Sequence, residues 1–185
     1  MNKQPQVTEQ TRRNLSQAFW ELYREKPIEK ITVREITDRA GYNRATFYLY
    51  FHDVYDLFNQ MEDEILSRVR KLVAEGLLQE EEFDLSHYMG AIVVMAEQYD
   101  AYITVLLGEH GDPSFAARLK EIISPVLDRF ILPAEGLSAQ QREILLEFYL
   151  SGLLAAINTW LSESEQMPID QFVDLVITHV LKEPC

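Results

Sequence analysis

The chain has 185 residues, enough for one small and one medium-sized domain, and its 47% hydrophobic content can supply a buried core. The one cysteine, Cys185, excludes an internal disulfide and fits a reducing cytoplasm. The polar first ten residues predict no secretory signal, and the apolar run at 144–157 is too interrupted for a membrane helix of about 20 residues. We therefore expect a cytoplasmic protein that does not associate with membranes.

The net charge of −13 is spread unevenly along the chain. Residues 1–60 contain nine Lys and Arg against eight Asp and Glu, whereas residues 61–185 contain eight against 22. A neutral, locally basic end on an acidic protein favours contact with a polyanion through that end. The charge distribution by itself is more typical of an ordinary acidic protein, so the prediction of function depends on the sequence motifs.

Helical periodicity runs through nearly every segment and predicts an all-α protein of about nine helices. The first is expected over 8–25 and ends before Pro27. A second follows over 33–40, because Thr32 and Glu35 have the spacing of a capping box and Gly41 can take the left-handed conformation that ends a helix. A third is expected over 44–51, with Asn43 as its N-cap.

The later helices are longer. Asp53 is expected to cap a fourth helix over 54–75, and residues 77–83 form a plausible boundary before two helices in 84–107. Asp112 and Pro113 open a helix to about 132, which Pro125 should kink. A second capping-box match, Ser138 to Gln141, opens a helix to 162. The last is expected over 168–181.

Residues 31–51 contain the parts of a helix-turn-helix: a short capped helix, a tight turn and a second short helix. Ile36, Ala40 and Phe47 can pack the two helices crosswise, and we expect Gly41 to relieve their close approach at the turn. The second helix would then enter the major groove of DNA, which is about 12 Å wide, with its N-terminal residues leading.

This segment resembles the TetR family of bacterial repressors. The resemblance is carried by Ile31-Thr32-Val33-Arg34-Glu35-Ile36, Ala40-Gly41-Tyr42 and Thr46-Phe47-Tyr48-Leu49-Tyr50-Phe51. It covers residues 8–68 by motif and the remainder by helix count. It implies a DNA-binding domain over 1–68, with the helix-turn-helix at 32–51, and a helical effector-binding and dimerisation domain over 69–185.

The resemblance also implies residue roles. Arg34 would reach a guanine edge, Arg44, Ala45, Thr46 and Leu49 would face bases, and hydroxyls would contact phosphate or sugar. The full predicted set is Thr32, Arg34, Asn43, Arg44, Ala45, Thr46, Tyr48, Leu49, Tyr50 and His52. An alternative for Arg34 is an ion pair with Asp38 on a solvated face. Tyr48 and Phe51 are partly core in any helix-turn-helix, so their aromatic character alone does not indicate a contact with DNA.

One position departs from the family pattern. A lysine that often precedes the acidic pair opening the fourth helix is missing, since the chain reads Val54-Tyr55-Asp56. His52 or the free amides at Asp53 and Val54 are candidate substitutes as a phosphate contact. We expect the change to lower DNA affinity and make it more pH-sensitive.

The family also implies that the last two long helices form a dimer interface. Large and small residues mix along 138–162, which would let a partner helix approach closely and form a four-helix bundle with 168–181. The predicted interface residues are Leu145, Phe148, Tyr149, Gly152, Ala156, Phe172 and Val176. The alternative is that both faces are buried inside one chain. A dimer would bind a pseudo-palindromic operator in double-stranded DNA.

An effector pocket is implied between the middle helices. Its candidates are aromatic, apolar or histidine residues: His87, Tyr88, Met95, Tyr99, Tyr102, Leu106, Phe130 and Trp160. Such a lining suits an apolar or flat ligand, although the same residues are often plain core. The loop 107–115 also resembles a C-terminal type found in a subset of Firmicutes members, some of which act through protein partners.

The sequence contains no nucleophile–base arrangement, phosphate loop or metal-ligand spacing, so we expect no enzyme, no metal and no cofactor. The favoured interpretation is a homodimeric repressor released from its operator by a small-molecule effector. The alternative is a co-regulator or activator of the same fold that signals through a protein partner.

Overall fold

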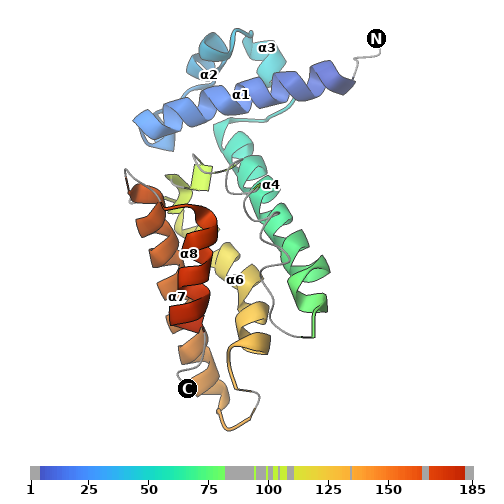
Figure 1. Ribbon diagram of the computed structural model, residues 1–185. Helices are drawn as coiled ribbons and strands as arrows, with labels where there is room; N and C mark the ends of the chain where they lie inside the picture. The colour runs from blue at the N-terminus through green and yellow to red at the C-terminus, as the bar shows by residue number, and fades with distance from the viewer. Residues whose placement is uncertain are drawn as a thin grey trace. The chain divides into compact units, whose positions relative to one another are not determined.

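The computed structural model describes residues 5–81, 94, 99, 102–103, 105–107, 111–133, 135–163 and 167–181. These residues form helices and turns without a strand, which confirms the predicted all-α class (Figure 1). The chain divides into two compact units, residues 1–64 and 65–185. Helix α4, Val54–Glu75, continues from the first unit into the second, and the predicted domain boundary at residue 68 falls within it.

The first unit is built on helix α1, Pro5–Glu25, with α2, Val33–Ala40, and α3, Arg44–Phe47, on one side of it (Figure 1). A short 3-10 turn, Ile28–Lys30, joins α1 to α2. Aromatic side chains of α1 and α4 form the centre, where Phe19 lies 5.6 Å from Tyr23 and 5.9 Å from Phe58 between ring centroids. This core supplies the base on which α2 and α3 rest.

Helix α2 begins and ends as predicted. Thr32 and Glu35 form the reciprocal capping box, and Gly41 is left-handed with φ 75°. The predicted left-handed conformation is thereby confirmed, but the predicted relief of a close approach between the helices is wrong, because a Cβ atom built at Gly41 would meet nothing within 4 Å. The left-handed backbone, which other residues rarely adopt, is what requires glycine at this turn.

Helix α3 is shorter than predicted and ends at Phe47 instead of Phe51. Its N-cap is confirmed, since Asn43 Oδ1 accepts from the Thr46 amide at 2.8 Å. Beyond Phe47 the chain tightens, and the Tyr50 amide donates to the Phe47 carbonyl at 3.0 Å. We attribute the tightening to the core, because Phe47 and Phe51 are both buried with ring centroids 5.3 Å apart.

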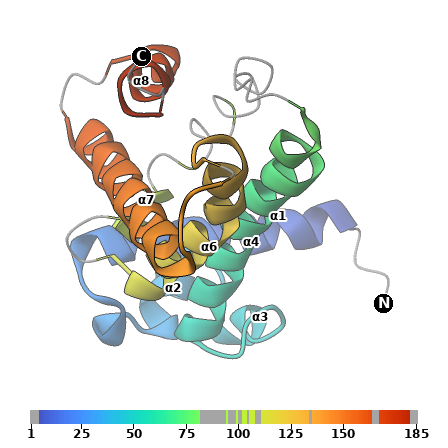
Figure 2. The ribbon, with the colours of Figure 1, turned by 90° about the horizontal axis from the view of Figure 1, so that it is seen from below.

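The second unit contains the 3-10 turn Leu77–Gln79, α6, Pro113–Phe130, α7, Ala139–Ser162, and α8, Ile169–Val176, which continues as a π-helical turn, Ile177–Leu181. Helices α6 and α7 lie side by side (Figures 1 and 2). The caps predicted at Asp112 and Ser138 are confirmed. The two helices expected in 84–107 lie largely outside the described residues.

Helix α7 is apolar around most of its circumference, yet Leu150 and Leu161 are its only described residues that are buried. One side packs against α8, where Phe172, Val173 and Val176 form a small core. By length and mean hydropathy α7 could also cross a membrane, a property that it shares with core helices of water-soluble proteins and that is weak evidence alone. Another side packs against α6, and Ile144 and Phe148 are the large apolar side chains of α7 that stay exposed.

Candidate nucleic-acid interface

The ten predicted DNA contacts lie at the start of α2 and along the segment 43–52, and α2 packs against α3. Eight of them are exposed, while Thr46 and Tyr50 are half-buried. Tyr48 and Leu49 expose 58% and 63% of their surface. Two adjacent large side chains of the segment are thus exposed to solvent.

Buried neighbours explain why these side chains point outward. Ile36 and Phe47 have no exposed surface and Phe51 has 2%, so α2, the end of α3 and the segment after it are each anchored in the core. The predicted packing of Ile36 and Phe47 between the two helices agrees with this burial. The exposed residues between the anchors therefore have defined positions despite the shortness of α3.

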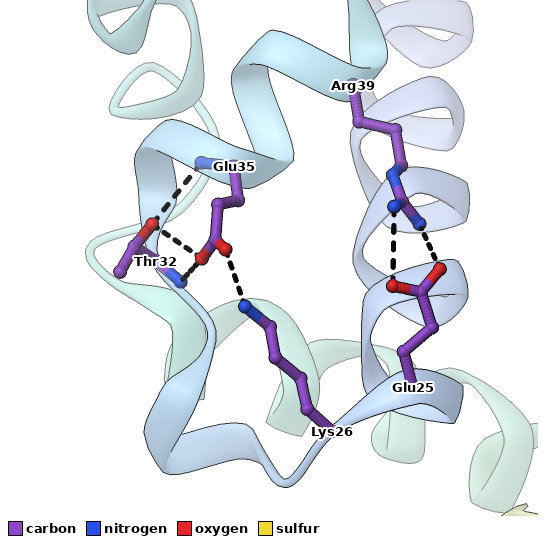
Figure 3. Close-up of polar contacts among 5 residues, drawn as sticks. All are labelled: Glu25, Lys26, Thr32, Glu35 and Arg39. Carbon is purple, nitrogen blue, oxygen red and sulfur yellow. Dashed lines mark hydrogen bonds and ion pairs between the residues drawn. The ribbon is translucent and has the colours of Figure 1, made fainter.

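The hydroxyl of Thr32 is engaged within the chain (Figure 3). It accepts from the Glu35 amide and donates to Glu35 Oε2 at 2.8 Å, and Lys26 Nζ contacts Glu35 Oε1 at 2.5 Å. The hydrogen bond from Lys26, followed by those from Thr32, lowers the pKa of Glu35 to about 2. A phosphate contact by Thr32 would have to compete with this carboxylate.

Two long-range contacts tie the helix-turn-helix to α1. Arg39 donates to Glu25 Oε1 at 3.0 Å from the end of α2 (Figure 3). Asn14 Nδ2 donates to the Tyr42 hydroxyl at 3.0 Å, directly before the Asn43 cap. Sequence reasoning missed both contacts, because partners 14 and 28 residues apart leave no local pattern to detect.

The arginines of the segment differ in their surroundings. Arg34 makes the alternative contact, an ion pair with Asp38 at 3.4 Å, and both side chains are about 70% exposed. Such a pair contributes at most about 1 kcal/mol, so it can open when a stronger partner arrives. Arg44 is exposed and makes no ion pair among the described residues, which leaves its guanidinium available.

Two carboxylates occupy the start of α4, where the family lysine is missing. Asp53 Oδ1 accepts from the Asp56 amide and Asp56 Oδ2 accepts from the His52 amide, both at 2.8 Å. The hydrogen bond from His52, followed by that from Gln60, holds the pKa of Asp56 below its usual value. These contacts use two amides inside the chain and place negative charge at a helix end that would otherwise attract an anion.

The predicted pocket residues are divided between several places in the second unit. Tyr99 and Leu106 are buried, and Tyr99 lies 6.0 Å from Tyr102 between ring centroids. Trp160 instead stacks on Phe172 at 5.0 Å in the α7–α8 core. Phe130 lies under the Arg129 guanidinium. His87, Tyr88 and Met95 fall outside the described residues.

A shallow groove of about 490 Å³ between α6 and α7 involves none of the predicted pocket residues. Small residues such as Ala116 and Ala117 line it, together with Lys120 and Glu147. Lys120 Nζ contacts Glu147 Oε1 at 2.6 Å and Ser151 Oγ at 2.7 Å, so its charge is already compensated.

The predicted dimer residues also differ in exposure. Phe148 exposes 70% of its surface and Gly152 is exposed, whereas Leu145, Tyr149 and Ala156 are half-buried. Phe172 and Val176 are buried against α7 within the same chain. The alternative of internal burial therefore applies to these two residues, and α7 keeps an open apolar face.

Comparison with known proteins agrees with this architecture. Residues 17–61 match the model of bacterial regulatory proteins of the tetR family, and residues 83–181 match a transcriptional regulator C-terminal region. The chain belongs to the TetR family. Its helix-turn-helix is thus that of a DNA-binding transcription regulator, as the sequence motif predicts. Among curated proteins, none matches this chain.

Solved structures share the fold at low identity. A TetR transcriptional regulator from Streptococcus agalactiae is 21% identical, with a TM-score of 0.68 over 96% of this chain and 97% of its own. The fatty acid degradation regulator FadR from Bacillus halodurans is 16% identical, with a TM-score of 0.59 over 97% and 98%. The dihydroxyacetone kinase operon activator DhaS is 15% identical, with a TM-score of 0.57 over 92% and 96%.

Proposed function

We propose that this TetR-family chain is a cytoplasmic, homodimeric repressor that binds a pseudo-palindromic operator and is released from it by a small-molecule effector. The observation that carries the proposal is the exposed segment 43–52, held on the buried Phe47 and Phe51, with Arg44 in no ion pair among the described residues. Exposed donors and apolar side chains on a short, anchored helix suit the edges of bases in a major groove.

Within the segment, each residue type has a chemical partner in DNA. The Arg44 guanidinium can donate twice to a guanine, and Ala45 and Leu49 can contact thymine methyl groups. Tyr48 and Tyr50 can donate to phosphates that fix the register. Asn43 has its Oδ1 engaged with Thr46, so its side-chain NH₂ remains for DNA.

The exposed apolar side chains of α7 support the proposed dimer. Ile144 and Phe148 are 61% and 70% exposed, and Gly152 on the same helix face would let a second helix approach closely. Leu175 on α8 and Val180 in the π-helical turn that follows it are nearly half exposed. Burying each large apolar side chain contributes about 1.5–3 kcal/mol, so a bundle of α7 and α8 from two copies would be stable. Such an interface also accounts for the apolar composition of α7 without a membrane.

Release by an effector requires a ligand that binds the two states of the protein with different affinity. The aromatic pair Tyr99 and Tyr102 is the described part of the second unit that best suits an apolar ligand. The alternative is an activator or co-regulator that signals through a protein partner. The fold by itself accommodates it, since DhaS, described as an operon activator, has a similar structure.

The DNA-binding proposal is tested by gel shift on the promoter next to the protein's own gene. Arg44→Ala should lower affinity about 10- to 100-fold, since one bidentate arginine contact contributes about 1–3 kcal/mol, and Tyr50→Ala should also weaken binding. Arg24→Ala is the matched control, because Arg24 is an exposed arginine of α1 without an ion pair among the described residues. Unaltered binding by both Arg44→Ala and Tyr50→Ala would overturn the assignment of the segment 43–52 as the surface that contacts DNA.

A further inference from the structure

The large hydrophobic side chains of the first unit that remain exposed lie close together in the chain. They are Tyr48, Leu49 and Tyr55, at 58%, 63% and 50% exposure. Tyr48 and Leu49 belong to the predicted DNA contacts, and Tyr55 does not. Its neighbour Val54 is buried, so the first turn of α4 is anchored by Val54 and presents Tyr55 outward. Tyr55 is thus a large exposed side chain in the first turn of α4, three residues beyond His52.

The carboxylates at this helix end limit the kind of group that can contact DNA there. Asp53 and Asp56 are both held by backbone amides of the same turn. Their charge offsets the positive end of the helix dipole, and they would draw any nearby cation into an ion pair. A phenol is neutral at physiological pH, is not drawn into such a pair, and has an O–H that can donate to a phosphate oxygen.

We infer that Tyr55 is a further DNA contact, in which the phenol O–H donates a hydrogen bond to a backbone phosphate and the ring covers the adjoining sugar. This inference rests on the proposed DNA binding and adds a residue to it. At the start of α4, the DNA backbone would then be bound by a neutral side chain instead of a cation. A neutral contact releases no counterion, so it adds affinity without steepening the salt dependence of binding.

The structure supports this assignment in two further ways. Tyr55 makes no hydrogen bond or ring contact among the described residues, unlike Tyr42, whose hydroxyl is held by Asn14. Several cations of the first unit make ion pairs with carboxylates, namely Arg12, Arg13, Lys26, Arg34 and Arg39. A phosphate contact by any of them would have to replace such a pair, whereas one by Tyr55 would not.

The test uses the full-length protein and a labelled DNA duplex that the wild type enriches from a random library. Affinity is measured by fluorescence anisotropy at salt concentrations from about 50 to about 200 mM, a range over which the loss of phosphate contacts changes the affinity measurably. Tyr55→Phe should bind at least about threefold more weakly at every salt concentration, with the slope of log affinity against log salt unchanged. Tyr23→Phe is the matched control, since it removes a hydroxyl from the α1–α4 aromatic cluster of the same unit and should bind like the wild type.

A second variant reports on the proximity of the phosphate. Asp53→Asn keeps an N-cap while it removes one negative charge, so it should bind more tightly at low salt and lose that gain at high salt. Wild-type affinity for Tyr55→Phe, a slope altered by about one, or no effect of Asp53→Asn would each overturn the inference. Failure of the wild type to enrich any duplex would instead overturn the proposed DNA binding.

Discussion

Two surfaces of the molecule expose large apolar side chains: the segment 43–52 proposed to read DNA (the reading segment), with Leu49 at 63%, and the face of α7 that carries Phe148, at 70%. Their neighbours differ. In the chain, Leu49 stands between Tyr48 and Tyr50, whereas Phe148 is one helical turn from Ile144 and from Gly152. An exposed apolar side chain therefore does not identify its partner by itself. The chemistry around it favours a polyanion in the first case and a second helix in the second.

The two surfaces also differ in how they are held. Helix α7 has 24 residues and a complete capping box, so much of its order is local. Helix α3 has four residues, too few to be stable alone, and depends on Phe47 and Phe51 below it. The shape of the reading segment is thus a property of the core of the first unit.

The largest expected effects come from placing a carboxylate on each surface in turn. Leu49→Asp sets a negative charge against DNA and should lower affinity more than about 100-fold while the protein stays dimeric. Phe148→Asp buries a charge in the proposed interface and should dissociate the dimer. Analytical ultracentrifugation and fluorescence anisotropy measure the two properties. A monomeric Leu49→Asp or a fully dimeric Phe148→Asp would contradict the division between the surfaces.

The dependence of the reading segment on its core predicts a loss of stability. Phe47→Ala should lower the free energy of unfolding by about 3–5 kcal/mol, because Phe47 is fully buried and its truncation leaves a cavity. Tyr48→Ala, at the next position and largely exposed, should change it by no more than about 0.5 kcal/mol. Urea unfolding followed by circular dichroism measures both. Equal effects would mean that Phe47 does not anchor the segment.

The smallest effect concerns the capping network of α2. The pKa of Glu35 is lowered to about 2, so its contribution to stability is present above its ordinary value of 4.5 and is lost as pH falls toward 2. Glu35→Gln should therefore unfold more easily than the wild type near pH 6, and the difference should disappear near pH 2. Glu29→Gln, an exposed glutamate of the preceding 3-10 turn, is the control. A difference that persists at pH 2 would assign it to packing instead of charge.

Much of the architecture was predictable because helix ends are coded locally. The boxes at Thr32 and Ser138 and the caps at Asn43, Asp53 and Asp112 each involve residues two or three positions apart. The burial of Phe47 was likewise predictable from the crossing of the two short helices, whereas Tyr48, which was expected to be partly core, is 58% exposed. The exposure of Tyr55 was not predictable in this way, since it depends on which side of α4 the core covers.

By itself, the sequence determined the helical class, the position of the helix-turn-helix and the caps that open its helices, because each depends on backbone hydrogen bonds within one turn. The tertiary structure decided where α3 ends, how Arg39 and Tyr42 are tied to α1, and that Phe172 and Val176 pack inside one chain while Phe148 does not. These outcomes join residues far apart in the chain, and only the packing of whole helices brings such residues within reach of one another.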